Sequence, residues 1–359
     1  MMVGFLCGKI SIAGGHHNAF QSAGMAVKRT GQFFVGVDVG GTKILVGLFD
    51  GSLRLLAKRK TQTNARRGPE AVVAQVELAI RELVAGEGLR LNQIRAIGLG
   101  APGFARDGRV FQAYNIGWDD LGIGPILRRR IRVPVFVEND CNLFALGIHR
   151  VELKGKPRTM AGIFLGTGIG GGLIIDGKLY RGFNLAAGEF GQMIIDKGGV
   201  RAPNSFRGSL ESLASHVGIA RRLRQAVKGG EPTLLQAELG KTLKGLTSDH
   251  LRMAIARRDE LAKRIVCEAA AETGLCVAGI ISALGPEYVM LGGGVVETLQ
   301  RTMLPVIRKT AASHVLPGTM DGIRILLSTM GEEGGIYGAA VFSRDESRQS
   351  AQAGRCVKN

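Results

Sequence analysis

The sequence predicts an α/β protein with two related domains that face one another across a cleft. Short β-branched runs alternate with amphipathic helical stretches along the chain, which is typical of this fold class. A strand, a glycine-rich turn and a second strand open each half, at 37–43 and again at 165–172. Because 359 residues also exceed what one compact core usually needs, this internal repeat indicates two domains of similar architecture.

The first half alternates strands with helices. Its predicted strands are short apolar runs at 33–38, 44–49, 53–61, 94–99 and 134–137. Pro69 begins an amphipathic helix, because apolar residues recur at helical spacing as far as Leu83. A further helix is expected after Asp140.

The second half repeats this order at greater length. Its predicted elements are strands at 162–165, 172–175 and 288–291, helices from Glu211 onward and one long helix at 251–284. We expect a disordered leader at 1–31, a small N-terminal domain at 32–148 with about 331–342, a large C-terminal domain at 149–330 and a loose tail at 343–359. The native start is then Met1 or, as a hypothesis, Met25.

Composition excludes several classes of protein. Hydrophobic residues at 45% and charged residues at 21% indicate a soluble globular chain and exclude disorder and collagen-like repeats. The 5 cysteines are scattered without a Cys-x-x-Cys pair, so a disulfide framework is unsupported. The uncharged stretches 159–175 and 273–286 are too short or too glycine-rich to span a bilayer, and Lys9 interrupts the apolar start. We expect a cytoplasmic protein that does not associate with membranes.

The net charge of +17 invites an anionic partner. Most basic clusters lie on helix-like segments without interleaved aromatic residues, and only 5% of the chain is aromatic. Platforms for base stacking are therefore scarce, and solvated helix faces are the favoured interpretation of the charge. Nucleic-acid binding is not expected.

The first glycine-rich turn joins two strands. Because no helix follows it, the turn is neither a Walker loop nor a dinucleotide-binding fingerprint. The backbone of Gly40 and Gly41, the Thr42 hydroxyl and the Lys43 ammonium can all face phosphate oxygens. Asp38 beside the turn could hold Mg²⁺ through water. An ordinary hairpin turn with a solvated lysine is the alternative.

The second glycine-rich turn holds more glycine than a turn requires. Each glycine costs folding entropy, and the sequence shows no packing return for it, so close approach to phosphates is favoured over a structural turn. The residues concerned are Gly166, Thr167, Gly168, Gly170 and Gly171. A third group at 292–294 follows a buried strand and suits a flat nucleoside, although alone it is a weak signal.

Asp140 stands where a predicted strand ends and a helix begins. It could simply cap the helix. However, Asn139 and Asn142 add hydrogen-bonding groups, and open α/β sheets bind ligands at the carboxyl ends of strands. A carboxylate there can accept a hydroxyl proton as the oxygen attacks a phosphoryl group.

Two more carboxylates flank a loop in the second half. Glu189 and Glu211 lie among glycines, away from a charged helix face, and could accept hydrogen bonds from sugar hydroxyls. A surface loop with a glutamate at a helix N-terminus is equally compatible. Asn115, shortly before Trp118, is similarly ambiguous.

Taken together, these elements resemble the ROK family of sugar kinases, within the actin-like and hexokinase-like ATPase superfamily. The matching segments are 36–43, 100–103, 115–118, 138–142, 165–172, 188–189 with 211, and 291–295. They follow the family order from about Gln32 to Phe342. The resemblance implies two actin/hexokinase-like (ribonuclease H-like) domains flanking a cleft.

The resemblance also implies a role for each site residue. Asp140 would be the general base, and Asp38 would be the carboxylate on the magnesium side. The residues facing sugar hydroxyls would be Asn115, Asn139, Glu189, Gln192 and Glu211. The two glycine-rich turns would bind the phosphates of ATP, and Gly293 and Gly294 would bind its adenosine.

One departure concerns zinc. Many family members carry a Gly-His pair and a cysteine-rich zinc motif in this region. Here Gln192 takes the histidine position, and 200–210 contains no cysteine. We predict no structural zinc and a substrate loop held by packing instead. An amide can donate and accept hydrogen bonds, so the preference for a hydroxyl or an N-acetyl group stays open.

The implied reaction is transfer of a phosphoryl group from ATP to the 6-hydroxyl of a hexose, with glucose as the leading candidate. Mannose, fructose, N-acetylated hexosamines and polyphosphate as donor remain alternatives. A sugar-sensing regulator is the non-enzyme alternative. Relatives that are DNA-binding repressors carry an N-terminal winged-helix domain of roughly 60–80 residues. A repressor is not expected here, because only residues 1–31 precede the predicted small N-terminal domain and they lack a helical period. The resemblance further implies a homodimer.

Overall fold

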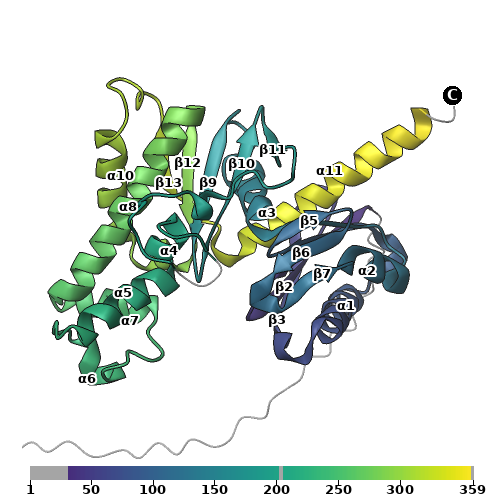
Figure 1. Cartoon of the computed structure of the whole chain (residues 1–359). Coiled ribbons are helices and arrows are strands. Elements are labelled where there is room, and N and C mark those ends of the chain that lie inside the picture. Colours follow the sequence, from purple (N-terminus) through teal and green to yellow (C-terminus); the bar gives the residue numbers. More distant parts are fainter. Residues whose placement is uncertain (1–30, 202–204, 357–359) are drawn as a thin grey trace, which may run out of the picture. The chain divides into compact units, whose positions relative to one another are not determined.

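The computed structural model describes residues 31–201 and 205–356, with the side chains of Asn115 and of residues 353–356 excepted. The predicted leader, apart from Gly31, therefore lies outside the described residues. The chain from Gly31 onward forms one compact unit, shown in Figure 1. The predicted boundaries between the two domains stay a prediction.

The first sheet contains five strands in the order β3-β2-β1-β4-β8. β1 pairs antiparallel with β2, and β2 pairs antiparallel with β3. β4 and β8 extend the other edge in parallel. The strands are β1 (Phe33–Val39), β2 (Lys43–Phe49), β3 (Leu55–Gln62), β4 (Ile94–Ala101) and β8 (Val135–Asn139).

The second sheet repeats this plan in the order β11-β10-β9-β12-β13. β9 and β10 form an antiparallel hairpin that β11 extends, and β12 and β13 add in parallel. The strands are β9 (Met160–Leu165), β10 (Ile169–Ile175), β11 (Lys178–Tyr180), β12 (Tyr288–Gly292) and β13 (Arg324–Leu327). The internal repeat predicted from the two glycine-rich turns is confirmed, and the structure extends it with two strands that were not predicted, β11 and β13.

A third, small sheet was not foreseen from the sequence. It has the order β5-β6-β7 and follows β4 in the chain. Its strands are β5 (Phe104–Arg106), β6 (Arg109–Ala113) and β7 (Trp118–Leu121). A 3₁₀ turn at Tyr114–Ile116 joins the last two strands, and it carries the backbone of Asn115.

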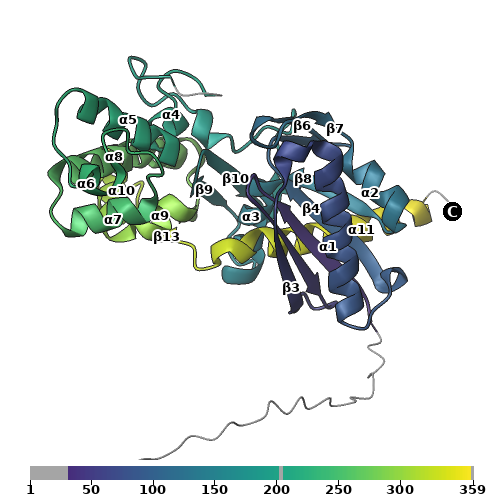
Figure 2. The same cartoon turned by 90° about the horizontal axis from the view of Figure 1, so that it is seen from below.

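Helices pack on both large sheets, as Figure 2 shows from below. Those joined to the first sheet are α1 (Pro69–Gly86) and α2 (Ile123–Ile131). Those of the second half are α4 (Leu210–Ala214), α5 (His216–Lys228), α6 (Leu235–Leu239), α7 (Ser248–Ala256), α8 (Glu260–Leu284), α9 (Gly294–Thr298) and α10 (Gln300–Ser313). Each group buries its apolar face against its own sheet in a separate core.

Two helices, α3 (Asp140–Gly147) and α11 (Gly334–Cys356), pack against each other, and α11 also packs on the first sheet. Glycine makes the approach of α11 to the strands close. A Cβ added at Gly36 would lie 2.0 Å from the Ile336 carbonyl oxygen, and one at Gly98 would lie 1.9 Å from that of Ala339. Part of the glycine content therefore serves packing of a helix on a sheet.

The predicted loose tail at 343–359 is wrong over the residues described. α11 continues through this segment to Cys356. Ser343 and Ser347 are buried, and the Ser343 hydroxyl donates to the Ala340 carbonyl 3.0 Å away. The segment contains few apolar residues, which predicts a tail. Its serines can nevertheless be buried, because their hydroxyl groups bond to carbonyl groups of the same helix.

The predicted single helix at 251–284 is also wrong. The helix is interrupted between α7 and α8, where Arg258 adopts a positive φ of 63°. Asp259 then caps α8, because its carboxylate accepts the Ala262 amide at 2.9 Å. α8 is the one helix, among the residues described, that is long and apolar enough to cross a membrane, and most of that apolar window is buried in the second core.

Candidate active site

Parallel pairing brings the first group of predicted site residues to one edge of the first sheet. Asp38 in β1 lies opposite Gly100 in β4, and Gly100 lies opposite Glu138 in β8. A Cβ added at Gly100 would lie 3.3 Å from the Cα atom of Asp140. Asp38 and Asp140 therefore lie on either side of Gly100, near the carboxyl end of β4, as expected where parallel strands end at the same edge of a sheet.

Both aspartates are partly buried, and their carboxylates interact. Burial raises the pKa of Asp38 to about 7, with a further contribution from Asp140 that Lys43 partly offsets. Burial also raises the pKa of Asp140, while hydrogen bonds from Cys141 oppose the rise. A carboxylate with a raised pKa is a better proton acceptor near neutral pH than an ordinary aspartate.

Asp140 is not the cap of its helix. That position belongs to Asn139, whose side-chain oxygen accepts the Asn142 amide at 3.0 Å. The Asn139 amide nitrogen donates to the Gly103 carbonyl, also at 3.0 Å. Capping by the preceding residue leaves Asp140 as the first helical residue. Its own carboxylate accepts the Cys141 amide at 2.8 Å.

Glu138 is a buried carboxylate that sequence reasoning missed. It accepts hydrogen bonds from the Asn142 side chain at 3.0 Å and from Arg181 at 3.3 Å. Arg181 lies in the loop after β11, so this ion pair joins the strand that leads to Asp140 with the segment that leads to Glu189. Its signal in the sequence was only its place beside Asn139, at the end of an apolar run.

The second glycine-rich turn is built around Glu211. One oxygen of the Glu211 carboxylate accepts the Ile169 amide at 2.8 Å. The other accepts the side-chain amide of Gln192 at 3.3 Å. A Cβ at Gly168 would lie 2.4 Å from the first oxygen, so glycine is required for this contact. The predicted Gln192 and Glu211 therefore meet at the turn that begins at Gly166.

Glu189 connects the two groups of predicted residues. Burial raises its pKa, and repulsion first from Asp140 and then from Glu211 adds to the rise. Burial likewise raises the pKa of Glu211, against the hydrogen bonds from Ile169 and Gln192. Carboxylates from both halves of the chain therefore lie within electrostatic reach of one another.

Gly170 and Gly171 have a packing role, so the prediction that the glycines of the second turn serve no packing is wrong for these two residues. Both lie in β10. A Cβ at Gly170 would lie 2.3 Å from the Cys141 sulfur, and one at Gly171 would lie 2.4 Å from the Phe190 ring. These glycines therefore allow β10 to touch α3 and the segment after Glu189. A role in phosphate binding stays a prediction for them, as it does for Gly166, Thr167 and Gly168.

The first glycine-rich turn is a tight hairpin. The Gly40 amide donates to the Lys43 carbonyl at 2.9 Å, and the Thr63 hydroxyl donates to the Gly40 carbonyl at 2.8 Å. The Lys43 ammonium pairs with Glu332 at 2.6 Å, and Lys60 pairs with the same carboxylate at 2.8 Å. Hydrogen bonds from these two lysines lower the pKa of Glu332 to about 2.

Glu332 was also missed from the sequence. It lies in a single turn at Gly331–Glu333, between β13 and α11. The adjacent pair Glu332 and Glu333, followed by two glycines, was the available signal. The alternative reading of Lys43 as a solvated lysine is therefore replaced by an ion pair that spans most of the chain.

The third glycine group lies beside the second. Gly293 has a φ of 92°, and a Cβ there would lie 2.5 Å from the carbonyl oxygen of Leu165, the last residue of β9. The space around Gly294 is open, and this residue begins α9. The turns expected to face phosphates and nucleoside thus follow neighbouring strands of one sheet.

The described part of the chain has no cluster of three or more histidine, cysteine or acidic side chains arranged around a metal. Asp38 nonetheless fits Mg²⁺ held through water. Its carboxylate is a hard oxygen ligand, and a cation beside it would relieve the repulsion from Asp140 that contributes to its raised pKa. The side chain of Asn115 lies outside the described parts, so its predicted sugar contact stays a prediction.

Comparison with known sequences identifies the family of the chain. The sequence model of the ROK family matches residues 34–346. A glucokinase of Halalkalibacterium halodurans is 32% identical over 310 residues, which cover 86% of this chain and 93% of that protein. A glucokinase of Thermotoga maritima is 30% identical over 314 residues, which cover 87% of this chain and 97% of that protein.

Solved structures share the fold. A ROK family glucokinase from Streptomyces griseus in complex with glucose and AMPPNP has a TM-score of 0.73 at 30% identity, covering 87% of this chain and 99% of that one. A ROK hexokinase from Thermus thermophilus has a TM-score of 0.72 at 30% identity, covering 88% and 99%. The chain therefore belongs to the ROK family, and it has the actin/hexokinase-like fold that its sequence motifs imply.

Proposed function

We propose that the protein transfers the γ-phosphoryl group of ATP to the 6-hydroxyl group of a hexose, with glucose as the leading substrate. The coarse activity, a sugar phosphotransferase, rests on the family and on glucokinases 30% and 32% identical over most of the chain. The finer choice of glucose and ATP is supported by the Streptomyces griseus relative, whose structure holds glucose and AMPPNP.

One observation carries the proposal: Asp140 lies within electrostatic reach of a carboxylate of each half. Its charge contributes to the raised pKa of Asp38 on one side and of Glu189 on the other. Asp38 stands beside the turn proposed to face phosphates, and Glu189 stands with Glu211 on the side proposed to face the sugar. A base in this position can reach a hydroxyl that is held between the two sides.

Asp140 accepts the proton of the 6-hydroxyl as that oxygen attacks the γ-phosphorus. The transferring group needs orientation and charge stabilisation more than covalent chemistry. The backbone of Gly40 and Gly41, together with Thr42 and Lys43, would supply donors to the phosphates. Mg²⁺, when bound beside Asp38, would neutralise phosphate charge.

The sugar would lie against Glu189, Glu211 and Gln192, with Asn139 and Asn115 nearby. Glu211 is already held by two donors, so it is oriented before a sugar binds. The turn around Gly166 would approach the phosphates, and Gly293 and Gly294 would face the adenosine. A closed site would also exclude water, which competes with the hexose as acceptor.

An N-acetylated hexosamine is the second candidate substrate. The N-acetylgalactosamine kinase AgaK of Shewanella is 28% identical over 313 residues. Gln192 favours this possibility, because its amide can exchange both kinds of hydrogen bond with an acetamido group.

The test is ADP release from ATP and Mg²⁺ with glucose, mannose, fructose, N-acetylglucosamine and N-acetylgalactosamine. We expect glucose to have the highest kcat/KM and to yield glucose 6-phosphate, detected by its dehydrogenase. A higher kcat/KM for a hexosamine would select the second candidate. Sugar binding without ADP release would contradict the kinase and indicate a sugar-sensing regulator.

A further inference from the structure

We propose that Arg222, assisted by Arg221, is a positioning residue that holds Glu211 in place for the sugar. This inference rests on the proposed function, because it takes Glu211 as a group that faces the substrate. Both arginines lie on α5, and neither stands beside the proposed sugar or phosphate groups in the sequence.

The helix that carries Glu211 is too short to hold itself. α4 has 5 residues, and Ser209 caps its start by accepting the Ser212 amide at 3.2 Å. A helix of this length leaves nearly all of its carbonyl groups without partners inside the helix. Isolated helices so short are unstable in water, so its position depends on neighbouring elements.

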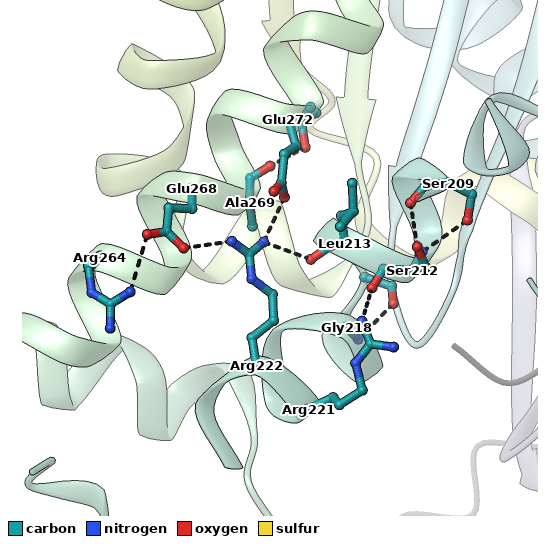
Figure 3. Close-up of polar contacts among 12 residues, drawn as sticks. Ser209, Ser212, Leu213, Gly218, Arg221, Arg222, Arg264, Glu268, Ala269 and Glu272 are labelled. Atoms are coloured by element: carbon teal, nitrogen blue, oxygen red, sulfur yellow. Dashed lines mark hydrogen bonds and ion pairs between the residues drawn. The ribbon is translucent and has the colours of Figure 1, made fainter. Parts of the chain in front are cut away.

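The two arginines supply the missing partners, as Figure 3 shows. Arg221 donates to the Ser212 carbonyl at 2.8 Å, and Arg222 donates to the Leu213 carbonyl at 3.3 Å. These are the two carbonyls that directly follow Glu211. Arg221 also donates to the Arg201 carbonyl in the preceding loop. A guanidinium with several donors can satisfy such groups together.

Arg222 is itself held rigidly by two carboxylates of α8. Its other contacts are Glu272 at 2.7 Å and Glu268 at 2.6 Å (Figure 3). The side chains of Arg222 and Glu272 are 17% and 20% exposed, so this charge-assisted bond is largely shielded from water, whereas Glu268 is 40% exposed. α8 contributes many residues to the core of the second half, so the contacts fix the end of α4 to a helix of that core.

The contacts form a continuous connection to the substrate side. α8 holds Arg222, Arg222 holds the end of α4, and Glu211 on α4 accepts the Ile169 amide at 2.8 Å. The predicted packing of the substrate loop is therefore supplemented by guanidinium hydrogen bonds. A displacement of α4 would move the Glu211 carboxylate away from the second glycine-rich turn.

Arg264 provides a matched control within the same cluster. It pairs with Glu268 at 3.3 Å and with Glu231 at 2.5 Å. Among the residues described, Arg264 donates to these two glutamates and to no carbonyl of α4. Arg264→Met thus removes one positive charge beside the same glutamate and leaves the α4 carbonyls bonded.

The experiment compares Arg222→Met, Arg222→Lys and Arg264→Met in the full-length protein. In Arg222→Met we expect the KM for glucose to rise about tenfold, as for the loss of about 1.4 kcal/mol of binding. The KM for ATP should stay within about twofold, because Lys43 and the first turn are untouched. Arg222→Lys should restore part of the glucose KM, and Arg264→Met should resemble the wild type.

A second readout does not depend on activity. Hydrogen exchange of the Ile169 amide, which donates to Glu211, should accelerate in Arg222→Met and remain unchanged in Arg264→Met. If Arg222→Met fails to fold, Arg221→Met takes its place in both measurements, since it removes the bond to Ser212. Equal changes in the two KM values, equal behaviour of the Arg264 variant, or unchanged Ile169 exchange would overturn the inference.

The two failures can be told apart. A wild type that phosphorylates no hexose would contradict the proposed function, whereas the exchange measurement would still decide whether Arg222 positions Glu211. A wild type that phosphorylates glucose together with an Arg222→Met variant of normal glucose KM would contradict the inference alone.

Discussion

The two large sheets have the same strand order and the same strand directions, but their corresponding edges carry different chemistry. β8, the last strand of the first sheet, ends at Asn139, and Asp140 follows it. After β13, the corresponding strand, the chain presents Ser328 and Thr329. There a carboxylate is present as Glu152, but it accepts the Ser328 hydroxyl at 2.7 Å and the Thr329 amide at 3.0 Å.

The repeated topology therefore brings a carboxylate to the corresponding strand end of each sheet. The hydrogen-bond partners of each carboxylate determine whether it can react or only holds the structure together. Both oxygens of the Glu152 carboxylate accept hydrogen bonds from the segment after β13, so this carboxylate holds that segment in place. Asp140 accepts one backbone amide and faces other carboxylates. This difference fits the proposal that Asp140, and not Glu152, accepts the substrate proton.

The largest expected effect separates these two edges. Asp140→Asn should lower kcat by about 10²–10⁴-fold, because an amide cannot take the hydroxyl proton. The matched Glu152→Gln variant should keep kcat within about twofold, although it can lose some stability. ADP-release assays, with circular dichroism to confirm the fold, give both values. A normal kcat in Asp140→Asn would remove the base from this edge.

The next comparison lies within the second turn. Gly168→Ala places a methyl group 2.4 Å from the Glu211 carboxylate, whereas a Cβ at Gly166 would meet only the Gly168 carbonyl oxygen, at an ordinary contact distance of 3.8 Å. We expect the glucose KM of Gly168→Ala to rise about tenfold, as for one lost hydrogen bond. Gly166→Ala should leave the glucose KM unchanged, and a raised ATP KM in this variant would support phosphate binding at the turn. Steady-state kinetics with each substrate varied makes the comparison.

Equal glucose KM values in the two alanine variants would contradict the role assigned to Glu211. The two alanine variants therefore distinguish a glycine that is needed for packing from one that is needed for the close approach of a ligand. A glycine needed for packing should disturb a protein contact, and a glycine needed for the ligand should disturb only binding.

A third prediction concerns stability and pH at Asp38. Burial raises its pKa from 3.8, the ordinary value that we take for the unfolded chain, to about 7 in the folded protein. An acid whose pKa is raised on folding contributes stability that is fully present at a pH below its pKa in the unfolded chain. This contribution is lost as the pH rises through its pKa in the folded protein. Asp38→Asn should therefore gain stability relative to the wild type between about pH 4 and pH 7.

Above pH 7 the gain should be constant. Its size is a few kcal/mol at most, since one pKa unit corresponds to about 1.4 kcal/mol and Asp38 keeps part of its surface in water. Urea unfolding at pH 5 and pH 8 measures it. A variant that is less stable than the wild type at pH 8 would show that the buried charge is compensated.

The smallest effect concerns the ion pair of Lys43. Glu332→Gln should lower the ATP KM by about two- to fivefold, because ion pairs this exposed contribute roughly 0.2–1 kcal/mol and compete with phosphate for the lysine. Glu333→Gln is the control, since that carboxylate pairs with Lys58. Kinetics at low ionic strength would reveal the difference. An unchanged ATP KM in Glu332→Gln would place Lys43 outside the phosphate site.

Much of the fold was predictable because local patterns encode it. Apolar β-branched runs specify strands, and two similar glycine-rich hairpins indicated the repeated sheet. Asp140 and Asp38 were also predictable, since each lies at or near the end of such a run. The end of α11 was not, because its buried serines resemble a polar tail. The break before α8 depends on the single residues Arg258 and Asp259.

By itself, the sequence determined the strand, glycine-rich turn and strand that open each half, and the position of Asp140 at the end of an apolar run. These features depend on neighbours in the chain, so periodicity and spacing reveal them. Only the tertiary structure decided that Glu332 holds Lys43, that Arg222 holds α4 and that Gly170 packs on Cys141. Such contacts join residues far apart in the chain, and their geometry exists only once the helices and sheets have packed together.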